Sequence, residues 1–278
     1  VLRWLHGGCD LTLVTSSIMQ EELVSHGAAP AASCDVWKRG VDSDIFHPKF
    51  RSESMRARMA GGEPEKPLVV HVGRLGAEKN LYFMKDIMAK IPGARLAVVG
   101  DGPERAGLEE HFKGTDTVFM GMLTGDDLSE AYASGDVFLM PSESETLGFV
   151  VLEAMAAGLP VVAVRAGGIP DILDRDTETG FLYPPGDLDK VVALTKALLE
   201  DKALREKVGE AGRKEVERWG WRAATEHLRD VQYTFAVDQW EGRRRLVTRI
   251  LQFFAFFATR VANFFGLGGK VKLEPKAS

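Results

Sequence analysis

The sequence predicts an α/β fold built on a doubly wound, Rossmann-like parallel sheet. Between residues 68 and 200, short apolar runs of strand length alternate with segments whose apolar residues recur at helical spacing. Such alternation is typical of parallel strands joined by crossover helices. The chain has 278 residues, of which 45% are hydrophobic and 27% charged. This ordinary composition suits one large domain, or one domain with pieces of another.

The expected strands are short apolar runs. They lie at 10–15, 68–72, 94–99, 117–120, 137–140, 161–164 and 181–183. The expected helices carry apolar residues on one face, and they lie at about 81–91, 126–134, 147–158, 188–200, 202–218 and 222–240. Another helix is expected after Ser16 or Ser17, ending at Gly27. Helices are also expected to open at Gly100–Arg105 and at Arg165–Asp171.

The segment after the strand at 137–140 has the plainest organisation. A polar loop at 141–145 leads into a helix that Ser144 or Thr146 could cap and that Gly158 could end. The helix N-terminus would then face the carboxyl end of the sheet. Open α/β sheets bind ligands at that edge, where free N–H groups attract phosphate.

Two carboxylates belong to this segment, Glu145 in the loop and Glu153 about two helical turns further on. In one interpretation Glu153 is solvated on the outer helix face and Glu145 is an ordinary loop acid. In the other, both face the mouth of the sheet and accept hydrogen bonds from sugar hydroxyls. A buried, unpaired charge is costly, so Glu153 needs either water or a partner. Spacing alone leaves both interpretations open and slightly favours the first.

The loop at 73–80 is a candidate anion site, because it follows a buried strand and contains Gly73, Arg74 and Lys79. Arginine can bind phosphate with two hydrogen bonds, and lysine supplies a compact positive charge. Taken alone, however, two basic loop residues are usually solvated and carry no function.

Two other loops have weaker signals. Gly100 and Gly102 begin a G-x-G-x-x-G pattern, but Arg105 occupies its third position, so we predict no nicotinamide site. The loop Gly121-Met122-Leu123 could read a nucleobase edge with its backbone atoms, or it could simply join a strand to a helix.

Charge and cysteine content exclude some functions. The formal net charge is −5, which gives no global electrostatic reason to expect nucleic acid as a partner. The cysteines, Cys9 and Cys34, form no metal-ligand pattern, and their scarcity suits a reducing compartment. The chain opens without an initiator methionine, a signal peptide or a transit peptide, so we expect an amino-terminally truncated product.

The C-terminal part differs in composition from the rest. Residues 243–258 combine basic residues with a dense aromatic stripe, and Arg249 and Arg260 interrupt the run too often for a membrane-spanning helix. The pattern favours an interfacial helix on anionic lipid. The alternative is a helix that packs back on a missing domain. Residues 266–278 are expected to be disordered.

The central segment resembles a known family. Glu145 and Glu153 match the E-x7-E motif of the retaining glycosyltransferases with the GT-B fold (glycosyltransferase family 4), and Pro141–Ile172 reads like their signature. Trp37–Pro48 and Ala131–Met155 are similar, as whole phrases, to the plant and algal branch that makes sulfoquinovosyl diacylglycerol, a sulfolipid. The resemblance covers roughly residues 8 to 240.

The resemblance implies a division of the chain into five parts. These are the end of a truncated acceptor domain, an interdomain linker region, a nucleotide-sugar donor-binding domain, C-terminal helices with a membrane-associating segment, and a disordered tail. The parts are expected at 1–34, 35–66, 67–218, 219–265 and 266–278.

The resemblance also implies roles for single residues. Arg74 and Lys79 match the family's G-R-x4-K motif, which starts at Gly73 and holds the donor diphosphate, while Asn80 stands where many relatives have glycine. The family uses the loop Gly121-Met122-Leu123 to read the nucleobase. The backbone amides that would neutralise the growing charge of the diphosphate are those of Thr146, Leu147 and Gly148. Glu153 would accept from the ribose hydroxyls, and Glu145, the catalytic candidate, would orient the sugar near its anomeric carbon.

The function implied is transfer of sulfoquinovose from UDP-sulfoquinovose to diacylglycerol with retention of configuration, peripherally at the chloroplast envelope membrane. No cofactor is implied, and no metal is needed if cationic side chains neutralise the diphosphate. Two alternatives stay open. One is another lipid glycosyltransferase of the same family that uses a UDP- or GDP-linked glucosyl or mannosyl donor. The other is a donor-binding fragment without activity.

Overall fold

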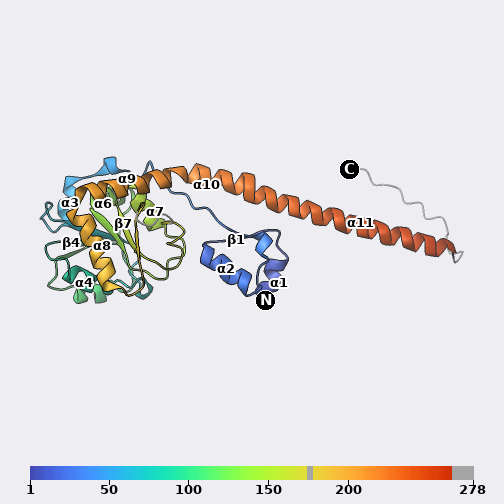
Figure 1. Ribbon diagram of the computed structural model, residues 1–278, viewed down its shortest axis with the longest axis horizontal. Coiled ribbons are helices and arrows are strands. Elements are labelled where there is room, and N and C mark those ends of the chain that lie inside the picture. Colours follow the sequence, from blue (N-terminus) through green and yellow to red (C-terminus); the bar gives the residue numbers. More distant parts are fainter. Residues whose placement is uncertain (174–177, 265–278) are drawn as a thin grey trace.

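The computed structural model describes residues 1–173 and 178–264. Its main body is a six-stranded parallel sheet with helices on both faces, and a small two-stranded unit lies beside it (Figure 1). A long C-terminal helix passes over both and extends beyond them (Figure 1). The predicted tail at 266–278 lies outside the described residues.

The main sheet confirms the predicted α/β fold with a doubly wound parallel sheet. Its strands pair in the order β5-β4-β3-β6-β7-β8. Because the order reverses between β3 and β6, the loops after these two strands flank the crevice in which such sheets bind ligands. The strands are β3 (Leu68–Val72), β4 (Arg95–Val99), β5 (Thr117–Gly121), β6 (Val137–Met140), β7 (Val161–Val164) and β8 (Phe181–Tyr183).

The small unit near the N-terminus pairs β1 (Thr12–Val14) with β2 (Cys34–Val36) in parallel. The sequence predicts β1 but no strand at β2, which lies where the expected interdomain linker region begins. The strand is only three residues long, and of these only Cys34 is fully buried, so β2 has no continuous apolar run to reveal it.

The helices agree with most of the predicted positions. They are α1 (Leu2–Gly7), α2 (Ser17–Ser25), α3 (Glu53–Met59), α4 (Phe83–Ala89), α5 (Arg105–His111), α6 (Gly125–Ser134), α7 (Phe149–Ala156), α8 (Leu188–Glu200), α9 (Lys202–Arg218), α10 (Trp221–His227) and α11 (Thr234–Phe264). The sequence does not predict α1 and α3. The helix expected at 222–240 is divided by a π-helical segment at Leu228–Tyr233.

The turn expected at Arg165–Asp171 is present, and residues 165–173 consist mainly of turns and bends. The amides of Ile172 and Leu173 donate to the Ile169 carbonyl at 3.0 and 3.1 Å, and the body of the helix expected after this turn falls on residues outside the described part of the chain. Gly167 has a left-handed φ of 58° within this turn, a conformation that glycine adopts without strain.

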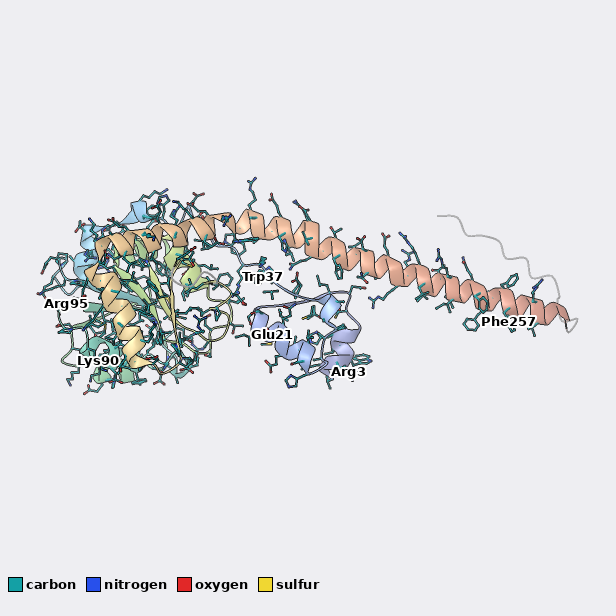
Figure 2. All side chains as sticks on the ribbon, viewed as in Figure 1. Arg3, Glu21, Trp37, Lys90, Arg95 and Phe257 are labelled. Atoms are coloured by element: carbon teal, nitrogen blue, oxygen red, sulfur yellow. The ribbon has the colours of Figure 1, made fainter. Side chains whose placement is uncertain are left out.

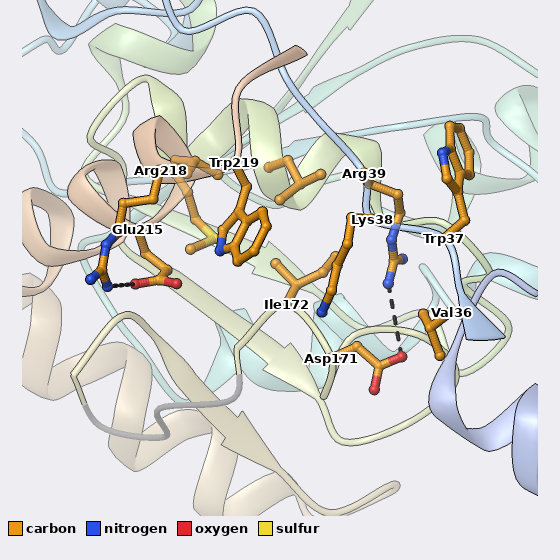
Figure 3. A pocket seen from close by; sticks show the side chains of 12 residues that line it. Val36, Trp37, Lys38, Arg39, Asp171, Ile172, Glu215, Arg218 and Trp219 are labelled. Carbon is orange, nitrogen blue, oxygen red and sulfur yellow. Dashed lines mark hydrogen bonds and ion pairs between the residues drawn. The ribbon is translucent and has the colours of Figure 1, made fainter. Parts of the chain in front are cut away.

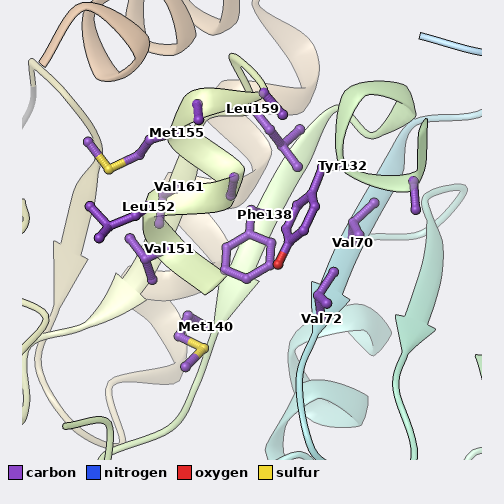
Figure 4. Packing of buried hydrophobic residues seen from close by; sticks show 14 of the residues in the cluster. Val70, Val72, Tyr132, Phe138, Met140, Val151, Leu152, Met155, Leu159 and Val161 are labelled. Atoms are coloured by element: carbon purple, nitrogen blue, oxygen red, sulfur yellow. The ribbon is translucent and has the colours of Figure 1, made fainter. Parts of the chain in front are cut away.

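Each face of the sheet has its own apolar core, as strand alternation requires. On one face, Val70 and Phe138 pack beneath α7, with Tyr132 of α6 filling the space between them (Figure 4). On the other, Val69 and Leu139 pack against helices α4, α5 and α8. Helices thus cover both faces and leave the loops at the carboxyl edge accessible.

The amino edge of the sheet is closed by a buried ion pair. Arg56 of α3 donates to the Asp136 carboxylate at 2.8 Å and also binds the carbonyls of Pro64, Lys66 and Ser134. Asp136 in addition accepts from the Leu68 amide (2.9 Å). This network fixes α3 at the edge opposite the ligand crevice.

Helix α11 is largely exposed. Arg243 pairs with Asp10 at 2.5 Å, and farther along the helix projects away from both units, with Phe257 near its far end (Figure 2). Its exposed apolar residues are Leu246, Val247, Ile250, Leu251, Phe253, Phe254, Phe256, Phe257 and Val261. None of the described helices combines the length and the apolar character that a bilayer crossing requires.

Candidate functional site

An uncharged histidine, His71, lies at the base of the crevice between β3 and β6. The two strands pair only at Val69–Val137 and Val70–Phe138. Beyond these pairs the fully buried His71 ring bridges the strands, its Nδ1 lying 2.9 Å from the Leu139 carbonyl oxygen. Burial lowers the pKa of His71 to about 4, so the imidazole is neutral at pH 7 and donates from Nδ1. Its Nε2 has no hydrogen-bond partner among the described residues.

The loop after β3 sends its two basic residues in different directions. Lys79 Nζ lies 2.8 Å from Glu145 Oε2, and the two side chains are only 17% and 15% exposed. Arg74 is 67% exposed and lies 3.9 Å from a Glu78 carboxylate oxygen. Lys79 therefore belongs to the crevice, whereas Arg74 lies at its solvent side.

Asn80 ends this loop in a left-handed conformation, with φ 53°. Among residues with a side chain, asparagine is one of the few that adopt this conformation readily. The geometry accounts for the departure from glycine noted in the sequence, because glycine and asparagine both satisfy the same turn.

The loop after β6 brings Glu145 onto the N-terminus of α7. Glu145 Oε1 accepts from the Gly148 amide at 3.1 Å, and Gly148, with φ 66°, is the N-cap residue. The predicted cap by Ser144 or Thr146 is wrong. The Ser144 hydroxyl instead donates to the Glu78 carbonyl (3.2 Å), and the Glu145 carboxylate takes the free amide.

One carboxylate thus occupies the place that the sequence assigns to phosphate. Glu145 accepts from Lys79 with one oxygen and from Gly148 with the other. An ammonium group and a free amide at a helix N-terminus are the kind of donors that bind phosphate. The Glu145 carboxylate is therefore an internal anion held between the two loops.

Glu153 of α7 points inward. Its Oε2 accepts from the Tyr132 hydroxyl at 2.7 Å, and burial raises its pKa although this hydrogen bond opposes the rise. It is half-buried rather than free in solvent, and within the described residues no hydrogen bond or ion pair joins it to Glu145, Lys79 or Arg74. Its partner Tyr132, fully buried on α6, has no signal in the sequence, because the pairing depends on packing between helices.

Close backbone approaches hold the loops in place. A Cβ at Gly100 would overlap the Gly73 carbonyl, and one at Gly167 would overlap the Glu145 carbonyl. The Gly168 amide donates to that same Glu145 carbonyl at 2.8 Å. The paired glycines after β7 thus buttress the loop that carries Glu145.

The loop after β5 lies at the same edge of the sheet. Gly121 has φ 71°, and its carbonyl accepts from the Gly100 amide at 2.8 Å. Met122 is 66% exposed, whereas Leu123 is buried in the core. In the described part of the chain, no group of three or more His, Cys, Asp or Glu side chains is placed to hold a metal ion.

We expect Tyr132→Phe to lower the free energy of unfolding by about 1 to 2 kcal/mol at pH 7, because Glu153 loses the hydrogen bond that the Tyr132 hydroxyl donates. Without the hydroxyl, the pKa of Glu153 rises further. The loss is therefore full when the folded carboxylate is charged. It shrinks as the pH falls through the pKa of Glu153 in the folded protein, which burial raises above the ordinary glutamate value of 4.5. Denaturant unfolding at pH 7 and pH 4 measures both; an equal loss at the two pH values would contradict the expectation.

Known proteins that are similar to this chain are glycosyltransferases. A sequence profile described as "Glycosyl transferases group 1" matches residues 56–215. The chain is 54% identical to the sulfoquinovosyl transferase SQD2 of Arabidopsis thaliana over 246 residues, 88% of this chain and 48% of that relative. It is 40% identical to a GDP-mannose-dependent alpha-mannosyltransferase of Mycobacterium tuberculosis, over 67% of this chain and 47% of that relative. The chain thus spans about half the length of these two proteins.

Solved structures share the fold. A sucrose-phosphate synthase from Thermosynechococcus elongatus superposes with a TM-score of 0.68 at 26% identity, over 89% of this chain and 61% of its own. The Anabaena protein HepE, solved in complex with UDP, superposes with a TM-score of 0.72 at 22% identity, over 81% of this chain and 64% of its own. The second likeness concerns the fold alone.

Proposed function

The chain belongs to the group 1 glycosyl transferases, and from this premise we propose that it is the donor-binding part of a retaining sulfoquinovosyltransferase. The donor is UDP-sulfoquinovose, the acceptor is diacylglycerol, and the product is the sulfolipid sulfoquinovosyl diacylglycerol. One observation carries the proposal. Lys79 and the N-terminus of α7 converge on a single anion in the crevice where the strand order reverses.

The donor diphosphate takes the position that the Glu145 carboxylate occupies in this structure. Lys79, the more exposed Arg74 and the amides of residues 146–148 then stabilise the negative charge that grows on the leaving diphosphate. Glu145, released from Lys79, orients the sugar near its anomeric carbon. Glu153 accepts from the ribose hydroxyls, using the carboxylate oxygen that Tyr132 leaves free. The loop Gly121-Met122-Leu123 reads the nucleobase edge.

The donor is tested by comparing UDP-sulfoquinovose, UDP-glucose and GDP-mannose as substrates of the natural-length protein, with diacylglycerol as acceptor. We expect kcat/KM to be at least about 100-fold higher for the sulfonated donor than for UDP-glucose. A preference for UDP-glucose or GDP-mannose would replace this proposal with the glucosyl or mannosyl alternative. The 40% identity to a GDP-mannose-dependent mannosyltransferase is the observation that supports the mannosyl alternative.

A chain that binds UDP and transfers no sugar, even at natural length, would instead be a donor-binding module. Absence of UDP binding would overturn the whole assignment, because the crevice would then have no ligand of this class.

We further propose that α11 holds the protein on an anionic membrane surface, peripherally at the chloroplast envelope where the acceptor lipid would lie. Its exposed apolar residues include Phe253, Phe254 and Phe257, and Arg244, Arg245 and Arg249 precede them along the helix. An exposed helix with aromatic and basic residues binds lipid through buried apolar area and through attraction to anionic head groups.

The membrane proposal predicts that the double variant Phe253→Ser/Phe257→Ser binds vesicles at least about tenfold more weakly than the unchanged protein. Cosedimentation with phosphatidylglycerol-containing vesicles measures this, with neutral phosphatidylcholine vesicles as the control for charge. A matched substitution of exposed aromatics elsewhere, Trp4→Ser/Trp219→Ser, should leave binding within twofold. Equal binding by all three proteins would contradict a role for α11.

A further inference from the structure

Arg39 holds the backbone of the loop that carries Glu145. It is only 8% exposed, and its Nη1 donates to the Leu147 carbonyl at 2.5 Å and lies 3.5 Å from the Thr146 carbonyl. A Cβ at Gly168 would lie 3.2 Å from the same nitrogen. The guanidinium therefore fits between the two carbonyls and the turn after β7, next to the amides that begin α7.

Arg39 also contacts Asp171, which in turn binds the small N-terminal unit. Arg39 Nη2 lies 3.8 Å from Asp171 Oδ2 (Figure 3). The two Asp171 oxygens accept from the Ser17 amide at 2.7 Å and from its hydroxyl at 2.5 Å. Since Ser17 is the first residue of α2, the carboxylate binds the free donors at that N-terminus.

These contacts form one continuous connection from α2, through Asp171 and Arg39, to the loop carrying Glu145. Its members come from the small unit, the segment that follows β2, and the turn after β7. Ser17 and Asp171 are 154 residues apart in the chain, and Arg39 and Leu147 are 108 apart. The planar guanidinium fork places Nη1 at the two carbonyls and Nη2 beside Asp171, so it fixes both ends of the connection, which a single lysine ammonium would not do.

We propose that Arg39 and Asp171 are positioning residues for the transfer reaction, which set Glu145 and the following amides according to where the α2 unit lies. The assignment rests on the proposed function of the same site. Among the described residues, neither forms a hydrogen bond or ion pair with Lys79 or with the Glu145 carboxylate. The effect therefore passes through the loop backbone, with a weaker electrostatic attraction between Arg39 and Glu145 beside it. When the Asp171–Ser17 contact breaks, Asp171 no longer holds Arg39 in a fixed position. The position of the loop that carries Glu145 then no longer depends on the position of α2.

The test compares Arg39→Lys, Asp171→Ala and Ser17→Ala in the natural-length protein. Each should lower kcat about tenfold. The dissociation constant of UDP should change less than kcat, because the misplaced amides supply only part of the diphosphate site and Lys79 stands on the other loop. Since the Ser17 hydroxyl acts through Asp171, the double variant Ser17→Ala/Asp171→Ala should be no slower than Asp171→Ala alone. Ser17 is only half-buried, so its variant keeps the test valid even where a buried substitution impairs folding.

Arg56→Lys is the matched control, because Arg56 is equally buried but lies at the amino edge of the sheet. It should lower thermal stability while leaving kcat within twofold. Variants that keep the kcat of the unchanged protein, or additive losses in the double variant, would overturn the positioning role. Failure of the unchanged protein to bind UDP or to transfer sugar would instead reject the proposed function.

Discussion

Glu145→Gln is expected to bind UDP about tenfold more tightly than the unchanged protein while transferring sugar at least about 100-fold more slowly. The Glu145 carboxylate accepts hydrogen bonds from both Lys79 and the Gly148 amide. A neutral amide of the same shape competes less strongly with the diphosphate for these donors. In the proposed mechanism, transfer falls because a glutamine cannot provide the charged group that orients the sugar.

Titration calorimetry with UDP and a transfer assay with the donor measure the two effects separately. Glu143→Gln is the matched control, since Glu143 lies two residues away in the same loop but is exposed. It should change both quantities less than twofold. Weaker UDP binding by Glu145→Gln would show that the carboxylate supports donor binding instead of competing with it.

Lys79→Met is expected to weaken UDP binding about 100-fold, because a hydrogen bond from a charged donor to phosphate is among the stronger polar contacts. Arg74→Met should weaken it less than about tenfold. The two residues differ in setting, since the Lys79 side chain is 17% exposed and that of Arg74 is 67% exposed. Solvent and salt screen the exposed charge more effectively.

The same lysine also neutralises a half-buried carboxylate, so Lys79→Met should lower the melting temperature. The double variant Lys79→Met/Glu145→Gln separates the two roles: it should recover the melting temperature without recovering UDP affinity. Scanning calorimetry and UDP titration are carried out on the unchanged protein, Lys79→Met, Arg74→Met and the double variant. Equal losses of affinity in Arg74→Met and Lys79→Met would show that both cations bind the diphosphate equally.

The main sheet could be predicted from the sequence because its strands are continuous apolar runs. Val137–Met140 is completely buried and is followed at once by Pro141, and it forms β6 in full. The loops after β3 and β6 could be recognised because each contains charged residues directly after such a run. Parallel strands place those loops at one edge, which brings Lys79 to Glu145.

Elements that depend on distant partners could not be predicted. The short helix α3 buries Arg56, which looks like a surface residue until Asp136, 80 positions later, supplies its counter-charge. In the same way, nothing near Glu153 in the sequence identifies Tyr132 as its partner. The difference in exposure between Arg74 and Lys79 depends on how the loop folds over the crevice, which spacing does not encode.

The π-helical segment at Leu228–Tyr233 changes the rotational setting of α11 relative to α10. A π turn accommodates one residue more than an α turn, and one residue corresponds to about 100° of rotation around an α-helix. It also directs Gln232 inward, where its amide donates to Asp35 and to the Val36 carbonyl. Deleting a single residue here would rotate the exposed phenylalanines of α11, which begin at Phe253, by about a quarter of a turn around the helix axis. The direction in which they point is thus set about twenty residues earlier in the chain.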